Sequence, residues 1–269
     1  MPEIWLARGR KLSIQRPLVM AILNATPDSF SDGGELGDDA GIGRRIRAAV
    51  SEGADILDVG GESTRPGHVA VPADEELRRV LPVLAAIRRI APRAVVSIDT
   101  RKAAVADAAL EAGADFVNDV SGLGDPAMAD VVRSAGCAVV LMRSGPLVGD
   151  PVDACGDQLA QLVRRAQTAG LSRDQLILDP GLGFGDPPGA DAVANLALLR
   201  GVARYAQGLP VLIGASRKRF VGALSKEPVA SRRVQGSVEA ARQAVAAGAS
   251  IVRVHDVAAT VQAIRDSVG

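Results

Sequence analysis

The sequence is short of aromatic residues and of any excess of one charge. Its 269 residues include one tryptophan, one tyrosine and four phenylalanines, and 31 basic side chains are balanced by 31 acidic ones. A nucleic-acid-binding surface needs a basic excess and rings on which bases stack, so we expect no nucleic-acid partner. No apolar stretch approaches the length of about 20 residues that spans a bilayer, so we expect no membrane association.

Cysteine is equally scarce. Cys137 and Cys155 stand apart without metal-ligand spacing, and we interpret Cys137 as a small core residue because it opens an apolar run. Residues 1–16 lack the apolar run of a secretory signal peptide. Together these features are typical of a reducing compartment, and we expect a cytoplasmic location.

Eight short apolar runs recur at roughly even spacing between amphipathic stretches of helical length. None of them alternates polar and apolar residues, which is typical of parallel strands buried on both faces. Eight strand–helix units in a chain of this length predict an α/β fold with one (β/α)8 TIM barrel. The runs are residues 19–23, 56–59, 95–98, 116–117, 138–142, 176–178, 211–213 and 251–254.

Two further runs lie near the N-terminus. Residues 3–6 and 11–14 flank Ala-Arg-Gly-Arg and predict a β-hairpin, which we expect to plug the N-terminal end of the barrel. We therefore expect one domain over 1–269, with the hairpin in 1–16 and the barrel in 17–269.

Nearly every run stops at a side chain that can do chemistry. Four of these, from different expected strands, are Asp99, Asn118, Asp179 and Lys218. Barrel enzymes carry their active sites at the carboxyl ends of the strands, so we expect the four to converge there. Such a set can line a flat polar heterocycle, because an Asp accepts two parallel N–H bonds from a guanidine-like ring edge. The alternative is that each acid caps the following helix or pairs with a neighbouring Arg.

Arg253 and His255 lie two apart in the last expected strand, so their side chains should share a face. We expect them to form an anion site suited to a phosphate or diphosphate. A structural role is the alternative for His255. The other expected members of the anion site are Asn24, Thr64 and Arg65.

Two more strand-end side chains carry weaker signals. We interpret Ser216 as a binding hydroxyl, because no histidine is placed near it in the sequence to act as its base. Met142 is a soft apolar residue that either packs on a ring face or belongs to the core.

Seven segments match, in order, the motifs of a known enzyme family. They are residues 22–34 (ILNATPDSFSDGG), 60–67 (GGESTRPG), 97–100 (SIDT), 118–122 (NDVSG), 178–185 (LDPGLGFG), 214–220 (GASRKRF) and 253–257 (RVHDV). On these motifs the chain, from about Leu18 onward, resembles the dihydropteroate synthases of folate biosynthesis. The resemblance implies that 6-hydroxymethyl-7,8-dihydropterin diphosphate condenses with para-aminobenzoate to give 7,8-dihydropteroate and pyrophosphate.

The resemblance also implies a role for each matching residue. The pterin-binding set is Asp99, Asn118, Asp179 and Lys218, to which we add Met142. The diphosphate-binding set is Asn24, Thr64, Arg65, Arg253 and His255. The aminobenzoate-binding set is Phe30, Thr64, Pro66 and Ser216. The residues expected to act most directly in catalysis are Asp32, Arg65, Asp99 and Lys218.

The family's mechanism is a dissociative, SN1-like displacement assisted by Mg2+, and the resemblance places Asn24 near the metal. The diphosphate leaves first, and Asp32 and Arg65 pair across two loops that order over the substrates, pterin first. Members of the family also imply a homodimer.

The chain departs from the family at Arg143, where a His is usual, and at Asp186, where a Lys is common. Two other interpretations remain. A pterin methyltransferase that serves a corrinoid protein would keep the pterin acids but would not need the 60–67 loop or the Ser-Arg-Lys triplet. A catalytically silent relative would have lost Asp32, Arg65 or Lys218, and all three are present.

Overall fold

The fold is a ring of eight parallel strands surrounded by helices. A computed structural model describes residues 2–25, 39–62, 70–184, 192–225, 227 and 229–268. The strands follow the order β8-β7-β6-β5-β4-β3-β10-β9, and a parallel bridge between Leu178 and Val211 brings the two ends together. This is the predicted TIM barrel. Its strands are β3 (Leu18–Asn24), β4 (Ile56–Gly60), β5 (Val95–Asp99), β6 (Phe116–Asp119), β7 (Val139–Met142), β8 (Leu176–Asp179), β9 (Leu212–Ile213) and β10 (Ile251–Val254).

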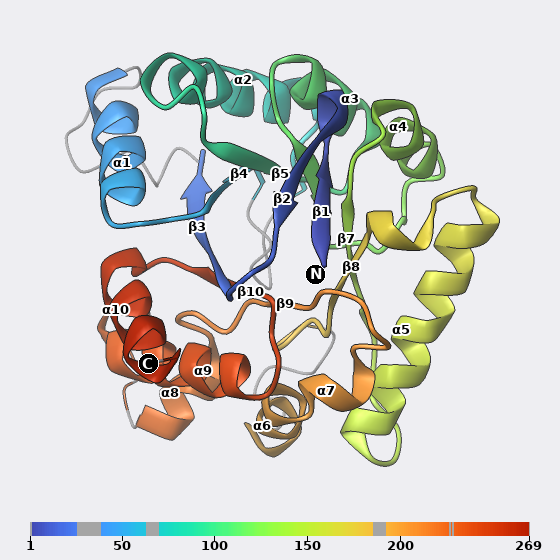
Figure 1. The fold of residues 1–269 in the computed structure, drawn as a ribbon, viewed down its shortest axis with the longest axis vertical. Helices are drawn as coiled ribbons and strands as arrows, with labels where there is room; N and C mark the ends of the chain where they lie inside the picture. Colours follow the sequence, from blue (N-terminus) through green and yellow to red (C-terminus); the bar gives the residue numbers. More distant parts are fainter. Residues whose placement is uncertain are drawn as a thin grey trace.

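Every strand of the ring is followed by at least one helix, and the helices form an outer layer around the sheet (Figure 1). The helices are α1 (Asp39–Ser51), α2 (Ala73–Ile90), α3 (Ala103–Glu111), α4 (Met128–Ala135), α5 (Pro151–Thr168), α6 (Ala192–Arg200), α7 (Val202–Tyr205), α8 (Arg219–Ser225), α9 (Val234–Ala246) and α10 (Val257–Val268).

The eight predicted strands are confirmed, and several extend further than their apolar runs. The ladders continue through the polar residue that follows, so Asn24, Asp99 and Asp179 are the last residues of their strands. A strand is held by its backbone hydrogen bonds, and a polar side chain therefore does not have to end it. As a result, these side chains extend from strands of the sheet and not from loops.

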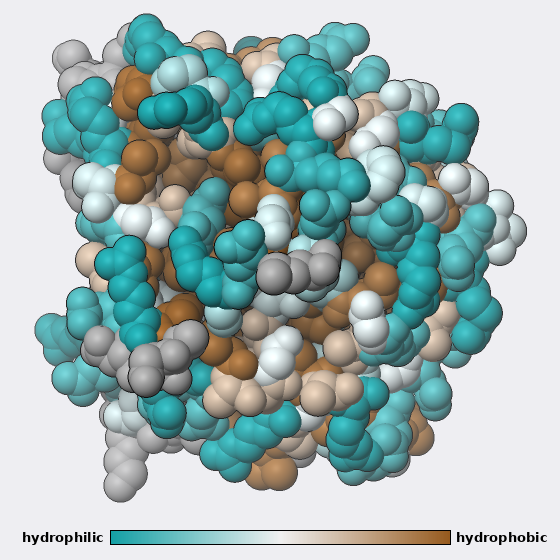
Figure 2. All heavy atoms as spheres, viewed as in Figure 1, coloured by the Kyte–Doolittle hydropathy of each residue, from teal (hydrophilic) through white to brown (hydrophobic). Residues whose placement is uncertain are grey.

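An antiparallel hairpin covers the N-terminal end of the barrel and lies across the middle of the ring in Figure 1. Its Ala7 N–H donates to the Asp115 carbonyl at 2.7 Å, and the Ala138 N–H donates to the Trp5 carbonyl at 2.7 Å. Asp115 and Ala138 immediately precede β6 and β7, so the expected plug is confirmed. The same face is mostly hydrophilic in Figure 2, with hydrophobic side chains showing between. The hairpin strands are β1 (Glu3–Leu6) and β2 (Arg10–Ser13).

One buried carboxylate holds the hairpin against the N-terminal end of the barrel. Asp115 is fully buried, and its two oxygens accept hydrogen bonds from Arg8 at 2.7 Å, Arg10 at 3.1 Å and Arg88 at 2.9 Å. The Val96 N–H also donates to it at 2.9 Å. A buried charge is tolerated only when it is paired and hydrogen-bonded, and here the partners come from β2, its preceding turn, α2 and β5.

We expect Asp115→Asn to lower the free energy of unfolding by about 3 kcal/mol, because the amide removes the charge that three guanidiniums share. Urea unfolding followed through Trp5, the single tryptophan, reports on the hairpin directly. The matched control is Asp130→Asn, since Asp130 pairs with Arg133 on the exposed surface and the change should cost about 0.5 kcal/mol or less. Equal stability of the two variants would contradict the assignment.

Candidate functional site

Polar strand ends lie at one level around the C-terminal mouth of the barrel. In the strand register Asn24 lies opposite Gly60, and Gly60 lies opposite Asp99. Asp99 lies opposite Asn118 in turn. A Cβ on Gly60 would come within 3.3 Å of the Asp99 Cβ and 3.5 Å of its Oδ2, so the glycine leaves room for that carboxylate.

Arg253 reaches across the mouth and binds two buried carboxylates. Its Nε donates to Asp58 Oδ2 at 2.5 Å, and its Nη2 donates to Asp99 Oδ2 at 2.6 Å. Asp58 is fully buried and Asp99 is 7% exposed. Charge-assisted bonds of this kind are the strong ones, so the guanidinium is held in a defined orientation.

Asp58 is the site residue that sequence reasoning missed. It lies inside the apolar run of β4, where it accepts hydrogen bonds from Ser97 Oγ and, at 3.2 Å, from Asn118 Nδ2. The sequence does hold a signal for it. A charged residue two positions before Gly60 on a buried strand must share the inward face with that glycine.

The electrostatics of this cluster favour different protonation states for its members. Burial raises the pKa of Asp99 to about 7, against the opposing attraction of Arg253, and the neighbouring charge of Asp58 adds to the rise. Burial by itself would lower the pKa of Arg253, but Asp58 and Asp99 raise it above its ordinary value. Arg253 therefore stays charged, and Asp99 is the group of this pair that can titrate near neutral pH.

A second cluster lies across the ring from the first. Met142 lies opposite Asp179 in the register of β7 and β8, and Met142 is 3% exposed. Asp179 Oδ1 accepts the Gly181 N–H at 2.7 Å, while Oδ2 accepts no hydrogen bond from the described residues. Lys218 Nζ donates to the Leu182 carbonyl and lies 4.2 Å from the centre of the Phe184 ring.

The charges of Asp179 and Lys218 support each other. Burial raises the pKa of Asp179, and the nearby ammonium of Lys218 opposes that rise. Burial lowers the pKa of Lys218 to about 8, and Asp179 opposes that fall. The mouth thus holds an ammonium and a carboxylate that are both partly desolvated, as a binding site for a polar ligand requires.

Ser216 and His255 meet at the ends of β9 and β10. The Ser216 Oγ lies 3.0 Å from His255 Nδ1 and accepts the His255 N–H at 3.2 Å. The two residues are 39 apart in the sequence, which is why sequence reasoning found no histidine partner for this serine. The fold therefore supplies a histidine beside Ser216 that is not near it in the sequence, and the binding role of Ser216 stays a prediction.

Another strand-end acid, Asp119, binds the loop that follows it and does not cap the next helix, α4, which begins at Met128. Its carboxylate accepts the Ser121 N–H at 2.8 Å, the Ser121 hydroxyl at 2.6 Å and the Leu123 N–H at 2.7 Å. All of these bonds shape the loop after β6. Asp99 instead pairs with an arginine, Arg253, across the barrel, which is the other form of the alternative.

Arg143 is buried behind the second cluster, at 1% exposure. Its Nε donates to the Pro180 carbonyl at 2.7 Å and its Nη1 to the Gly145 carbonyl at 2.7 Å, while its buried Nη2 has no hydrogen-bond partner among the described residues. The Arg143 N–H donates to the Asp179 carbonyl at 3.1 Å. The side chain at this position therefore supports the backbone at Pro180, directly after Asp179.

The first two long loops lie largely outside the described residues. The structure does show the start of the second loop, where Glu62 pairs with Arg101 at 2.6 Å and with Lys102 at 2.5 Å. Lys102 also pairs with the buried Glu76. The expected site residues outside the described part are Phe30, Asp32, Thr64, Arg65 and Pro66, and so is Asp186.

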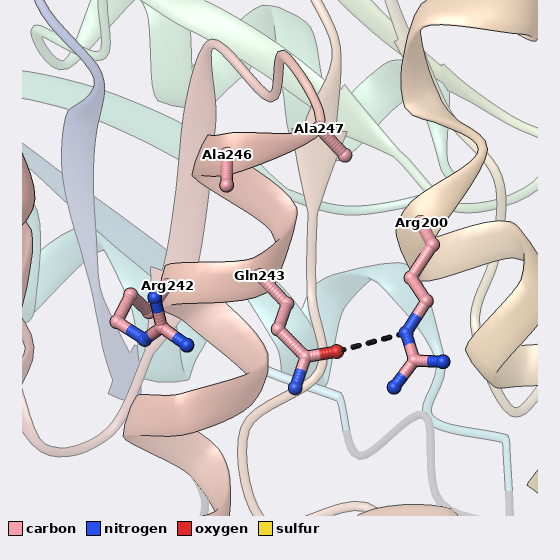
Figure 3. Close-up of a pocket in the computed structure, with 5 residues that line it drawn as sticks. All are labelled: Arg200, Arg242, Gln243, Ala246 and Ala247. Atoms are coloured by element: carbon pink, nitrogen blue, oxygen red, sulfur yellow. Dashed lines mark hydrogen bonds between the residues drawn. The ribbon is translucent and has the colours of Figure 1, made fainter.

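A hollow of about 410 Å³ on the outside of the barrel is separate from this site (Figure 3). It lies between the C-terminal ends of α6 and α9, which in this fold are at the N-terminal end of the barrel. The residues that line it are Arg200, Arg242, Gln243, Ala246 and Ala247.

Two searches of the described residues gave negative results. No helix in that part of the chain is long and apolar enough to cross a membrane. Nor do three or more His, Cys, Asp or Glu side chains in those segments gather where they could hold a metal ion.

Comparison with known proteins gives a consistent result. Residues 20–255 match the model of the pterin binding enzyme family. The dihydropteroate synthase of Synechocystis sp. is 40% identical over 259 residues, which are 92% of this chain and 88% of that protein. A probable bifunctional folylpolyglutamate synthase/dihydropteroate synthase of Haloferax volcanii is 45% identical over 91% of this chain, but the match spans only 30% of that longer protein.

Solved structures agree with the sequence relatives. The Xanthomonas albilineans dihydropteroate synthase with 4-aminobenzoic acid superposes with a TM-score of 0.90 at 42% identity, covering 99% of this chain and 97% of that one. The same protein in complex with 7,8-dihydropteroate gives a TM-score of 0.88 at 41% identity, covering 98% and 97%. The chain belongs to the pterin-binding enzymes and, among them, to the dihydropteroate synthase family.

Proposed function

We propose that this protein condenses 6-hydroxymethyl-7,8-dihydropterin diphosphate with para-aminobenzoate, giving 7,8-dihydropteroate and pyrophosphate. The observation that carries the proposal is the convergence of Asp99, Asn118, Asp179 and Lys218 on the mouth of the barrel. Relatives of similar length are dihydropteroate synthases, and one binds 7,8-dihydropteroate. Family and geometry therefore support the same reaction.

The pterin ring is assigned to the space between the two clusters. Asp179 offers Oδ2, and the second lone pair of Oδ1, to the N–H groups of the ring edge. Lys218 donates to a ring carbonyl or nitrogen, and Asn118 donates or accepts as the ring requires. Met142 supplies an apolar surface for a ring face. Asp99 is hydrogen-bonded to Arg253. We expect the carboxyl of Asp99 to change its protonation state when the ring binds.

The diphosphate is assigned to Arg253, His255 and Asn24. The bonds from Arg253 to Asp58 and Asp99 involve Nε and Nη2, so Nη1 is the nitrogen that we assign to the anion. A guanidinium whose orientation is already set loses little entropy when the anion binds. Thr64 and Arg65 complete this assignment from the sequence.

The reaction that we assign to this site is a dissociative displacement. The C–O bond to the diphosphate breaks, and the pterin ring stabilises the methylene cation that remains. Arg253 and His255 hold the negative charge of the leaving group, while Asp99 and Asp179 stabilise the cation. The neutral amine of para-aminobenzoate then attacks the methylene carbon and loses its proton afterwards, so no strong base is required.

Magnesium fits this donor set as an ion held mainly by the substrate. Mg2+ is usually bound through one or two protein oxygens together with substrate phosphates and waters. The Asn24 carboxamide is the protein oxygen that we assign to it. When bound, the ion would neutralise part of the charge on the leaving diphosphate.

The function and the metal are tested in one assay. Purified protein with pterin diphosphate, para-aminobenzoate and Mg2+ should form dihydropteroate, because Asp99, Asn118, Asp179 and Lys218 lie together at the mouth of the barrel. Chelation should abolish turnover, and added Mg2+ should restore it. Product formation that survives exhaustive chelation would contradict the metal requirement, and no product under any of these conditions would contradict the function.

We expect Asp179→Asn to weaken binding of a pterin analogue by about 2–3 kcal/mol, roughly 30- to 150-fold, because an amide offers one acceptor where the ring edge needs two. Isothermal titration calorimetry measures the loss. Asp107→Asn, on the exposed face of α3, is the matched control and should bind normally. Unchanged affinity of Asp179→Asn would mean that the heterocycle binds elsewhere.

We also propose a homodimer and a cytoplasmic location. Helices α9 and α10 pack side by side and are rich in alanine, which favours a flat surface for a second copy. Both cysteines are free and buried, as in proteins of a reducing compartment. Light scattering at micromolar concentration should give twice the chain mass of 27.6 kDa, and a single monomeric mass would contradict the dimer.

A further inference from the structure

Arg143 is a buried arginine whose guanidinium donates to uncharged oxygen atoms. The residue follows the end of β7 and is 1% exposed. Its Nε donates to the Pro180 carbonyl and its Nη1 to the Gly145 carbonyl, each at 2.7 Å, and Nη1 also donates to Gln158 Oε1 at 3.4 Å. Burying a guanidinium costs free energy, which such bonds offset. What they hold in place includes the backbone directly after Asp179.

One peptide group links Arg143 to Asp179. The carbonyl of the Pro180–Gly181 peptide accepts the bond from Arg143 Nε, and the N–H of the same peptide donates to Asp179 Oδ1 at 2.7 Å. A trans peptide is planar, and its C=O and N–H point in opposite directions. A bond that fixes the carbonyl therefore fixes the direction of the N–H as well. Hydrogen bonds at the two ends of one peptide also polarise and strengthen each other.

The backbone of residue 143 packs on the same segment. The Arg143 N–H donates to the Asp179 carbonyl at 3.1 Å. Gly181 adopts a φ of 64°, and a Cβ on it would lie 2.4 Å from the Arg143 carbonyl oxygen. Glycine permits this conformation and this close approach, but it also adopts other conformations readily. The peptide before it therefore needs a further bond to keep its orientation, and Arg143 Nε supplies one.

We propose that Arg143 is a positioning residue of the pterin site. Its Nε holds the Pro180–Gly181 peptide in the orientation whose N–H binds Asp179 Oδ1, and this leaves Oδ2 for the ring edge of the pterin. The inference deepens the proposed function and rests on it, because it takes Asp179 as the residue that binds the ring. The arginine that stands where the family usually has a His then acts on the first substrate and not on the second.

The alternative is that Arg143 acts through its charge alone. Burial raises the pKa of Asp179, and Lys218 is the strongest of the groups that oppose this rise, with Arg143 also among them. Two substitutions separate the charge from the hydrogen bond. Glutamine carries an N–H2 group as many bonds from Cα as Arg Nε but has no charge, and methionine has a similar length with no donor. A role of the hydrogen bond predicts that Arg143→Gln preserves the site and Arg143→Met does not.

The first test observes the peptide itself and needs no turnover. Protein labelled with 13C in the proline carbonyl and 15N in glycine gives selective N–H signals for the glycines that follow a proline, which are Gly67, Gly181 and Gly189. Pro180→Ala identifies the Gly181 signal by removing it. This N–H should exchange slowly with solvent in the unaltered protein, about 10-fold faster in Arg143→Met and near the original rate in Arg143→Gln. Fast exchange in the unaltered protein, or an unchanged rate in Arg143→Met, would overturn the proposal.

The second test measures which ligand is affected. In calorimetry with 6-hydroxymethylpterin, Arg143→Met should bind about 10-fold more weakly and Arg143→Gln less than about 3-fold more weakly. Affinity for inorganic pyrophosphate with Mg2+, and the KM for para-aminobenzoate at saturating pterin diphosphate, should not change in either variant. The matched control is Arg133→Met, the same substitution at an exposed arginine of α4, which should bind the pterin normally.

Two results of the second test would overturn the proposal. Equal losses of pterin affinity in Arg143→Met and Arg143→Gln would mean that the charge acts and not the hydrogen bond. An equal loss of pyrophosphate affinity in Arg143→Met would mean that the substitution damages the barrel mouth as a whole. Should Arg143→Met not fold, the exchange rate in the unaltered protein and the pterin affinity of Arg143→Gln still test the proposal.

The tests also separate this inference from the proposed function. If the unaltered protein forms no dihydropteroate, the proposed function fails, but the exchange of the Gly181 N–H and the pterin affinity still decide the role of Arg143. If turnover is normal and Arg143→Met changes neither the exchange rate nor the affinity, only the positioning role fails.

Discussion

The guanidinium of Arg253, held between the buried carboxylates of Asp58 and Asp99, is the interaction on which the mouth of this barrel depends. Three charges removed from water are stable only if each is paired with good geometry. Strands β4, β5 and β10 must therefore keep their register for the pairing to exist. In return, the pairing sets the direction of Arg253 before any ligand arrives, which is the condition for electrostatic stabilisation of a developing charge.

The two ends of the barrel use the same physics for different purposes. At the N-terminal end Asp115 is bound by three arginines and one backbone N–H, so its charge is well satisfied and it serves to hold the hairpin. At the C-terminal end the charges are only partly satisfied by protein groups. Asp179 keeps an oxygen without a bond from the described residues, and Lys218 has a lowered pKa. Because these charged groups are shielded from water and only partly paired within the protein, they can bind a ligand.

Support from behind the site comes from residues that do not line the mouth. Arg143 binds the Pro180 carbonyl next to Asp179, and Arg217 with Asp256 ties Ser216 to His255. Both arrangements act on the backbone at a strand end, where a small shift would move a site side chain directly. At position 143, where a His is usual in the family, the arginine donates to the Pro180 and Gly145 carbonyls of the loops behind the site.

The sequence by itself determined the barrel and its hairpin, because apolar runs are local features. It also marked the polar residues that end those runs, and the barrel brings the carboxyl ends of all strands to one face. Sequence reasoning missed Asp58 because the residue lies within an apolar run, and its partner Arg253 is distant in the sequence. Likewise, Ser216 and His255 became partners only in the closed ring, where β9 and β10 are neighbours. Pairings between distant residues depend on strand order and register, which only the tertiary structure decides.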